Sequence, residues 1–409
     1  MPARAALRHP NFRYYLGARV LTVNANEMQA VAVAWQVYGL THRPLDLGLV
    51  GLAQFLPAVL LFLVAGQTAD RFPRQRILET CYGGFALCSL GLCALSLRGV
   101  SAIAAIYAVL LMNGTVRAFN GPAGQAFTPL LVPPADFPNA VAWNSSIFQA
   151  STIVGPVLGG LLYGFTSSPV PVYACAAAEY LAALALIGRI RLRGQAARPA
   201  ASSRMAFEGL RYIWRHKLIL GAISLDLFAV LLGGAVALLP VYAREILKIG
   251  ASGLGILRSA PGVGAVLTAV AVARWPLQRR AGAVMLWCVC GFGVFTLIFG
   301  LSRSLPLSLA ALALIGACDM VSVIVRHTLI QLSTPDEMRG RVSAVNVVFI
   351  GASNEVGQFE SGITAQWFGA VPAVVLGGLG TIAIVALWAW RFPELRRVNQ
   401  LVGEYQGAR

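Results

Sequence analysis

Apolar stretches long enough to cross a membrane follow one another along almost the whole chain. A membrane-spanning helix needs about 20 mainly apolar residues, and twelve such stretches lie between charged or Pro/Gly-rich breaks. They run over Phe12–Tyr38, Asp46–Ala69, Ile77–Leu97, Ser101–Asn120, Ala140–Phe165, Val170–Ile190, Leu218–Tyr242, Gly253–Ala273, Ala281–Leu301, Leu305–Val325, Val342–Trp367 and Ala370–Trp390. Only 12% of the residues are charged, about half the share usual in soluble domains. The sequence therefore predicts an all-α membrane protein with twelve transmembrane helices and excludes a soluble enzyme.

The basic residues are distributed unevenly over the predicted connections. The formal net charge is +16, which in a soluble protein would suggest nucleic-acid binding, but basic residues of membrane proteins gather in cytoplasmic loops. Of the 32 Lys and Arg residues, 24 fall at one set of alternate connections and the termini, 5 fall at the other set, and 3 lie in or at the edge of helices. This bias predicts a multi-pass protein with both termini in the cytoplasm and no nucleic-acid partner.

One long polar connection divides the chain into two halves. We expect an amino-terminal six-helix bundle over residues 1–190, a basic cytoplasmic linker over 191–217, a second six-helix bundle over 218–391 and a cytoplasmic tail over 392–409. The halves echo each other weakly, since RHPNFRYYLGA near the start resembles WRHKLILGA after the linker, and Pro57 aligns with Pro261. Many secondary transporters consist of two such repeats around a central substrate site.

The connection after the second predicted helix reads GQTADRFPRQRIL and resembles the signature loop of the major facilitator superfamily. The resemblance implies that its glycine permits close helix approach, that its aspartate faces the positive end of a helix in the other half, and that its arginines form a cytoplasmic latch. The residues concerned are Gly66, Asp70, Arg71, Arg74 and Arg76. Pro73 departs from the usual glycine. An ordinary positively charged loop is the alternative interpretation.

Two further segments resemble motifs of the same superfamily. In NGTVRAFNGPAGQA, Arg117 followed by Asn120-Gly121 is similar to a motif in which an arginine is tied to proton coupling, and Asn113 and Asn120 share its helical face. The alternative is an arginine that reaches to the membrane surface. The segment GPVLGG matches the motif that marks drug:proton antiporters, with Gly155, Pro156, Gly159 and Gly160 at its defining positions. Its small residues can also simply allow close helix packing.

Six carboxylates fall inside predicted spans: Glu27, Glu179, Asp226, Asp319, Glu355 and Glu360. Each is energetically expensive in a membrane unless it is paired, protonated or facing water. We expect all but the peripheral Glu179 to take part in proton coupling with Arg117, and Glu27 is the first choice as carrier. Asp319 can instead form a structural ion pair with Arg326, and Asp226 can hold Arg19 or Arg117. Candidates for lining the substrate cavity are Asn24, Trp35, Asn113, Asn354 and Gln358.

The run GASNEVGQFESG resembles the eleventh helix of enterobactin-exporter-like members of the superfamily. Together the resemblances imply the major facilitator fold, with two pseudo-symmetric six-helix bundles, in the bacterial inner membrane. They imply a monomeric, proton-coupled exporter of an amphipathic small molecule, such as a drug or siderophore, surrounded by membrane lipids. A lipid or lysophospholipid flippase on the same fold is the alternative, and a non-transporting receptor is a third class. We expect no enzyme activity, no cofactor and no metal, because the seven cysteines lie in apolar stretches and no phosphate-binding loop occurs.

Overall fold

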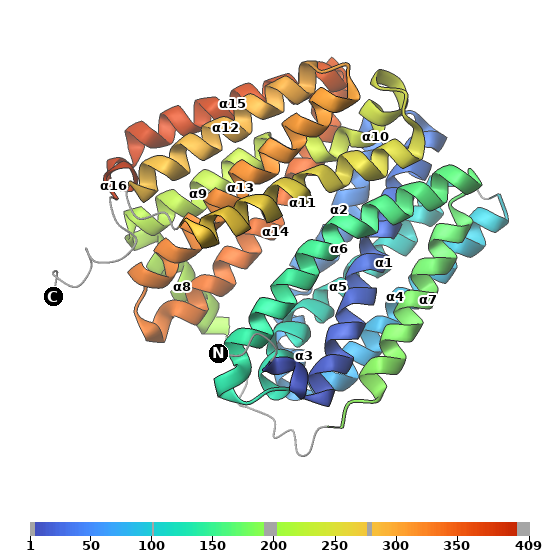
Figure 1. Cartoon of the computed structure of the whole chain (residues 1–409), viewed down its shortest axis with the longest axis horizontal. Coiled ribbons are helices and arrows are strands. Elements are labelled where there is room, and N and C mark those ends of the chain that lie inside the picture. The colour runs from blue at the N-terminus through green and yellow to red at the C-terminus, as the bar shows by residue number, and fades with distance from the viewer. Residues whose placement is uncertain (1–4, 100–101, 192–202, 276–279, 399–409) are drawn as a thin grey trace. The chain divides into compact units, whose positions relative to one another are not determined.

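The computed structural model describes residues 5–99, 102–191, 203–275 and 280–398, and these are almost entirely helical. The helices are α1 (Pro10–Thr41), α2 (Pro44–Leu60), α3 (Phe62–Arg71), α4 (Arg74–Leu97), α5 (Ile103–Phe127), α6 (Phe137–Thr166), α7 (Val170–Gly188), α8 (Ser203–Arg215), α9 (Lys217–Leu232), α10 (Leu239–Val241), α11 (Gly250–Arg274), α12 (Ala281–Leu301), α13 (Leu305–Ser333), α14 (Asp336–Phe368), α15 (Ala370–Arg391) and α16 (Pro393–Arg397). Short turns η1 (Ala6–Arg8), η2 (Thr128–Leu130), η3 (Pro134–Asp136), η4 (Ala235–Leu238) and η5 (Tyr242–Ile246) complete the order (Figure 1).

All twelve predicted stretches correspond to helical segments of the described chain. Nine of these segments are long and apolar enough by themselves to cross a membrane. Helices α1 and α14 have 32 and 33 residues but carry more polar residues, and α2 continues into α3 after a break at Leu61. The polar character of α1 and α14 makes them the natural place to look for function, because polar groups in a membrane need a reason to be there.

Several helix ends differ from the predicted ones. Helix α5 runs through Pro122 to Phe127 instead of ending at Asn120, and α13 continues to Ser333 instead of Val325. Conversely, α9 ends at Leu232, before Gly233-Gly234, and the chain continues as shorter turns to Ile246. Apolar windows locate the spans, but helices extend beyond the apolar region wherever neighbouring helices support them.

The chain forms two compact units that exchange short segments. Unit 1 contains α1, α2 from Leu52 onward, α3 to α7, and the segment Ile249–Ser259 at the start of α11. Unit 2 contains Arg43–Gly51 at the start of α2, the chain from α8 to Lys248, and the chain from Ala260 onward. Each of α2 and α11 therefore contributes its first turns to one unit and its remaining turns to the other.

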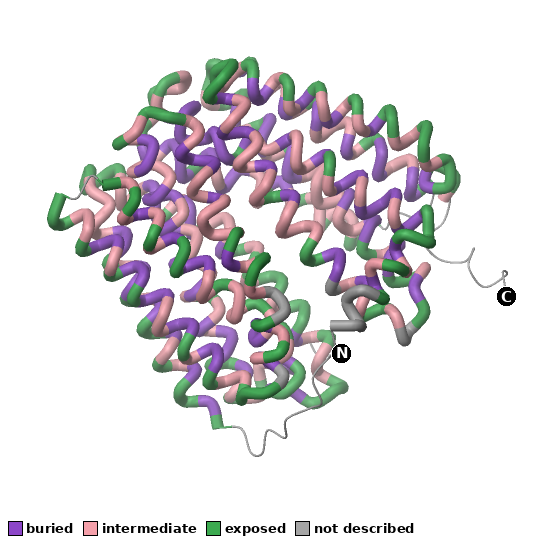
Figure 2. The backbone as a smooth tube through the Cα atoms, turned by 180° about the vertical axis from the view of Figure 1, so that it is seen from behind, coloured by how far each residue is buried: buried purple, intermediate pink, exposed green. Residues whose placement is uncertain are grey.

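The core of unit 1 lies between α1, α4, α5, α6 and α7. Helix α1 packs against α6 and α7, and α4 packs against α5 and α7 (Figure 1). Along α4 the buried residues recur every three or four positions, as at Ile77, Cys81, Phe85 and Ser89, so one face is turned inward (Figure 2). Large apolar side chains remain exposed on the outside, for example Phe165 at 84%. An exposed apolar surface of this kind is what a helical bundle presents to lipid.

The core of unit 2 is built in the same way from α9, α12, α13 and α15. Helix α12 packs against α13 and α15, and α9 packs against α14 and α15. Helix α8 occupies residues 203–215 of the connection predicted as a linker, and residues 192–202 lie outside the described part. Its Ile213 is 2% exposed in a cluster with α9, α13 and α14. Glu208 of α8 forms an ion pair with Arg341 of α14, so this helix is part of unit 2.

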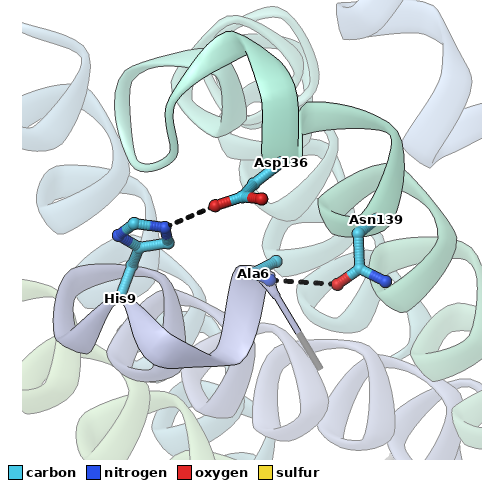
Figure 3. Close-up of polar contacts among 4 residues, drawn as sticks. All are labelled: Ala6, His9, Asp136 and Asn139. Carbon is cyan, nitrogen blue, oxygen red and sulfur yellow. Dashed lines mark hydrogen bonds and ion pairs between the residues drawn. The ribbon is translucent and has the colours of Figure 1, made fainter. Parts of the chain in front are cut away.

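The start of the chain is fastened to unit 1 by two polar contacts (Figure 3). His9 Nε2 lies 2.8 Å from Asp136 Oδ2, and the backbone N–H of Ala6 donates to Asn139 Oδ1 over 3.0 Å. These contacts connect η1 and the start of α1 with η3 and the start of α6. They fix the first turn of α1 to the start of α6.

We predict that Gly316→Ala destabilises unit 2. A Cβ at Gly316 of α13 would overlap the backbone carbonyl of Pro261 in α11, and overpacking of this kind costs about 1–3 kcal/mol. The thermal unfolding midpoint of the purified protein in detergent should fall by several degrees. Gly351→Ala in α14 is the matched control, because a Cβ there meets nothing within 4 Å. Equal midpoints for the two variants would contradict the packing of α11 on α13.

Candidate functional site

In unit 1 a pair of opposite charges joins two helices that are distant in the sequence. Arg258 Nε of α11 lies 3.7 Å from Glu27 Oε2 of α1, and the two side chains are 28% and 18% exposed. Both groups sit within helices of a membrane protein, where an unpaired charge costs several kcal/mol. The pairing lets both residues stay charged in a largely apolar surrounding.

One turn before Glu27, the side chain of Asn24 connects α1 to α7. Asn24 Nδ2 donates to Glu179 Oε1 over 2.7 Å. Asn24 Oδ1 and Glu179 Oε2 are buried and have no hydrogen-bond partner among the described residues. Glu179, expected to be peripheral, therefore belongs to the same polar cluster as Glu27. Buried polar atoms left without a partner are uncommon in folded proteins and usually have a function or a bound water.

The GPVLGG segment of α6 packs directly against the part of α1 that carries Asn24 and Glu27. A Cβ at Gly155 would lie 2.6 Å from Glu27 Cβ, and one at Gly159 would lie 2.7 Å from Met28 Cα. On the neighbouring face, a Cβ at Gly160 would lie 2.7 Å from Ala251 O and 2.8 Å from Gly255 Cα. Gly155, Pro156, Gly159 and Gly160 are all buried. The missing side chains thus let α6 contact α1 and α11 backbone to backbone.

The polar residues of α5 are placed at different depths. Asn113 is 1% exposed and its Nδ2 has no hydrogen-bond partner among the described residues, Asn120 is half-buried, and Arg117 is exposed. Gly114 lets α5 approach the backbone of Gln54 in α2. Trp35 of α1 is half-buried and packs edge-on against Tyr163 of α6, with ring centroids 6.5 Å apart.

The predicted latch lies between α3 and α4. Arg71 and Arg76 are exposed, and Arg74 Nη1 donates to the carbonyl of Ala126 at the end of α5 over 3.1 Å. A Cβ at Gly66 would meet nothing within 4 Å, so no close contact requires this glycine in the conformation described. Asp70 lies in α3, but its side chain is outside the described part of the structure.

Unit 2 contains a second buried ion pair, between Asp226 of α9 and Arg326 of α13. The two side chains are 7% and 2% exposed, so this pair is more deeply buried than Glu27 and Arg258. The sequence suggested Asp319 as the partner of Arg326, whereas the structure pairs Arg326 with Asp226. A pairing of Asp226 with Arg19 or Arg117, which belong to unit 1, stays a prediction. Arg326 lies one residue beyond the predicted span Leu305–Val325, but it is within α13 because that helix continues to Ser333.

Asp319 lines a small cavity together with Asp226 of this ion pair. Asp226, Asp319, Ser322 and Cys318 contribute to its wall, and it has room for about one water molecule. Two carboxylates, Asp226 and Asp319, therefore line the same cavity, and the ion pair of Arg326 is with Asp226.

The polar residues of α14 are less tightly held. Gln358 Nε2 donates to Glu355 Oε2 over 3.4 Å, as their shared face predicts, and Glu360 Oε1 accepts the hydroxyl of Thr364 over 2.8 Å. Asn354 is exposed and donates to the carbonyl of Ile350. Asn24, Trp35 and Asn113 lie in unit 1, whereas Asn354 and Gln358 lie in unit 2, and the substrate cavity they would share stays a prediction.

Sequence reasoning missed Arg258 as a site residue. The signal was present, because Arg258 stands alone in the apolar run GLGILRSAPG, and a charge within a membrane span marks a functional position. No short-range pattern identifies its partner, since Glu27 is far away in the chain. In the described ranges, no group of three or more His, Cys, Asp or Glu side chains could hold a metal ion.

Comparison with known proteins assigns the chain to a family. The sequence matches the family described as transmembrane secretion effector over residues 2–404. The chain belongs to this family. The family consists of major facilitator transporters and not of enzymes, so this member is a multi-pass secondary transporter.

Individual relatives and solved structures agree with this assignment. The chain is 26% identical over 395 residues to the enterobactin exporter EntS of Shigella boydii serotype 4, covering 96% of this chain and 94% of the relative. It is also 26% identical over 396 residues to the EntS protein of Escherichia coli O1:K1, with the same coverage of 96% and 94%.

Solved transporters of low sequence identity confirm the fold. A bacterial homologue of the human lysosomal transporter Spinster superposes with a TM-score of 0.73 at 14% identity, covering 95% of this chain and 98% of the homologue. The nucleoside transporter NupG superposes with a TM-score of 0.72 at 13% identity, covering 93% of this chain and 99% of NupG. The predicted major facilitator fold is therefore confirmed.

We predict that Asp226→Asn strongly destabilises this transporter. The substitution leaves Arg326 buried without its counter-charge, which typically costs 3–5 kcal/mol, whereas replacing both partners by uncharged residues is often nearly neutral. The yield of folded protein and its unfolding midpoint in detergent should fall for Asp226→Asn and recover in Asp226→Asn/Arg326→Met. A double variant that is no more stable than Asp226→Asn would show that the ion pair is not the cause.

Proposed function

We propose that the protein is a proton-coupled exporter of an amphipathic small molecule, such as a drug or a siderophore. In this mechanism inward movement of protons drives outward movement of the substrate by alternating access. The proposal extends the family assignment, which establishes a secondary transporter, to a direction, a coupling ion and a substrate class.

The observation that carries the proposal is the position of Glu27. Its carboxylate is partly buried, faces one cation and lies on the glycine face of the antiporter-like segment in α6. A carboxylate there can exchange its ion pair with Arg258 for a bound proton, which is what a proton carrier requires. Because the contact joins α1 to a segment from the second half of the sequence, a change of protonation alters the packing between the helices.

The buried carboxylates of unit 2 support the same proposal. Asp226 is neutralised by Arg326, so Asp319 is the carboxylate that can hold a proton beside the small cavity. Glu355 and Glu360 have hydrogen-bond donors and are candidates for secondary proton positions. Arg117, on the exposed side of α5, is a candidate for guiding protons or substrate.

Substrate class and direction rest on similarity and on composition. The relatives of similar length carry the name enterobactin exporter, and export of a comparable small molecule is the simplest expectation for this chain. Trp35 and Tyr163 provide aromatic surface, and Asn24 and Asn113 provide amide groups. Such a combination suits an amphipathic substrate, because orientation needs few polar contacts in a largely apolar pocket.

We predict that Glu27→Gln uncouples transport from the proton gradient. Proteoliposomes with an acidic interior should accumulate ethidium or enterobactin by exchange with protons that leave the vesicle. The variant should lose this accumulation by about tenfold or more, because glutamine cannot carry a proton, while exchange of the same probe without a gradient remains. Glu394→Gln, which removes an exposed acid of α16, is the control and should accumulate the probe like the wild type.

Two results would contradict this assignment. Wild-type accumulation that is unchanged when the gradient is collapsed would exclude proton coupling. Translocation of a fluorescent lysophospholipid that does not depend on Glu27, in the absence of probe transport, would favour a lipid flippase.

We further propose that both termini are cytoplasmic in a bacterial inner membrane. The proposal rests on the excess of basic residues at alternate connections. Green fluorescent protein fused after Arg409 should therefore fluoresce in bacterial cells, and alkaline phosphatase fused at the same position should be inactive. A fusion after Gly99, between α4 and α5, should give the opposite result. An active phosphatase at the carboxyl terminus would reverse the orientation.

A further inference from the structure

Helix α8 has one face that packs on unit 2 and one face that is turned outward. On the inner face, Ile213 is 2% exposed among residues of α9, α13 and α14, and the Tyr212 hydroxyl donates to the carbonyl of Ser333 over 3.2 Å. A Cβ at Gly209 would lie 2.8 Å from the carbonyl oxygen of Arg341, so the backbones of α8 and α14 approach closely (Figure 1). The inner face therefore holds the helix on unit 2.

The outward face of α8 carries two arginines and a tryptophan. Arg211, Trp214 and Arg215 are exposed, with Trp214 at 66%, and residues three and four positions apart lie on the same side of a helix. Within the described part of the chain, none of these three side chains takes part in a hydrogen bond or an ion pair. Glu208 lies on the same side but is already paired with Arg341. The two positive charges of the outward face are therefore uncompensated.

The outward face lies directly before a membrane span. Helix α8 ends at Arg215, and α9 begins at Lys217. The segment Lys217–Ile246 is long and apolar enough to cross a membrane. Trp214 and Arg215 therefore lie at the level where the span meets water. Tryptophan is enriched at this level in membrane proteins, and arginine directs its charge from there toward the lipid headgroups.

The sequence around α8 does not supply the missing negative charge. Residues 191–207, which lead into the outward face, contain four arginines and no acidic residue. Helix α16 differs in this respect, because its exposed Arg396 and Arg397 are accompanied by the exposed Glu394. A partner for the outward face of α8 must therefore bring its own negative charge. Because Trp214 is exposed beside the arginines, the partner must also have an apolar part.

We propose that Arg211, Trp214 and Arg215 form a binding surface for the headgroup of an anionic phospholipid, such as phosphatidylglycerol. The two guanidinium groups bind phosphate oxygens, for which arginine is well suited. The indole ring lies beside the first part of the acyl chains, where an aromatic ring with one polar edge is stable. A zwitterionic lipid binds less well, because its own cation offsets its phosphate. This surface goes beyond the proposed function, since it concerns the surrounding membrane and not the transported molecule.

The test measures lipid binding to the purified full-length protein in a neutral detergent. Native mass spectrometry counts the bound lipids during titration with phosphatidylglycerol or with phosphatidylcholine of the same acyl chains. The wild type should bind phosphatidylglycerol about tenfold more tightly, because basic residues at a membrane surface favour anionic lipids. Excess glycerol phosphate should not displace the lipid, because this soluble anion lacks the acyl chains that contact the indole ring.

The variants separate this surface from the general charge of the protein. Arg211→Gln/Arg215→Gln should bind the two lipids about equally, and its unfolding midpoint without lipid should stay that of the wild type because both positions are exposed. Arg211→Lys/Arg215→Lys keeps the charge and should keep the preference. Trp214→Ala should weaken the binding of both lipids alike. Arg396→Gln/Arg397→Gln, which removes two exposed arginines of α16 in the same unit, is the matched control and should bind lipid like the wild type.

Three results would overturn the lipid surface. An unchanged preference in Arg211→Gln/Arg215→Gln would show that α8 does not select the lipid. Equal losses in this variant and in Arg396→Gln/Arg397→Gln would show that total charge, and not α8, is responsible. Displacement by glycerol phosphate would indicate a site for a free anion instead of a lipid. None of these measurements involves transport, so the lipid surface can fail while proton-coupled export holds, and the reverse.

Discussion

The structure depends on the neutralisation of charge inside an apolar bundle. A helix in lipid satisfies its own backbone but not an ionised side chain, so a charge within a span has to find a partner on a neighbouring helix. Asp226 with Arg326, and Glu27 with Arg258, meet this requirement through ion pairs. Glu179 meets it in part through the amide of Asn24. The helices that carry these groups are held together by contacts whose strength changes when a proton binds.

The same helices approach each other with unusually little side-chain material between them. In a membrane, helix association has no hydrophobic driving force from water, and small residues allow the close packing that replaces it. At Gly155, Gly159 and Gly160 the packing brings α6 to α1 and α11, and at Gly264 and Gly316 it brings α11 to α13. Such interfaces contain few interlocking side chains, so two helices can separate without repacking a core. Backbone contacts alone do not specify which helices pair, and the ion pairs add contacts between particular side chains.

The fold could be predicted from the sequence because the thickness of the bilayer fixes the length of a transmembrane helix. Twelve apolar windows, the basic bias and the resemblance of Gly66–Leu78 and Gly155–Gly160 led to the fold that the family match and the solved transporters confirm. The ends of α5 and α13 were misplaced because tertiary support, and not hydropathy, decides where they stop. The pairings were also missed, since Glu27 and Arg258, like Asp226 and Arg326, are close only after folding. The sequence named Arg326 only as a possible partner of Asp319, seven residues before it, because neighbours along one helix are visible in a sequence and contacts between helices are not.

The contacts of helix α11 limit where the chain can tolerate an insertion or a deletion. The first turns of this helix contact unit 1 through Gly255 and Arg258. Further along, Gly264 packs against Ala313 in unit 2. Inserting or deleting one residue between them turns one face by about 100° relative to the other, because an α-helix has 3.6 residues per turn. Either the arginine or the glycine would then point away from its contact. The stretch between Arg258 and Gly264 should thus vary in composition among functional relatives far more readily than in length.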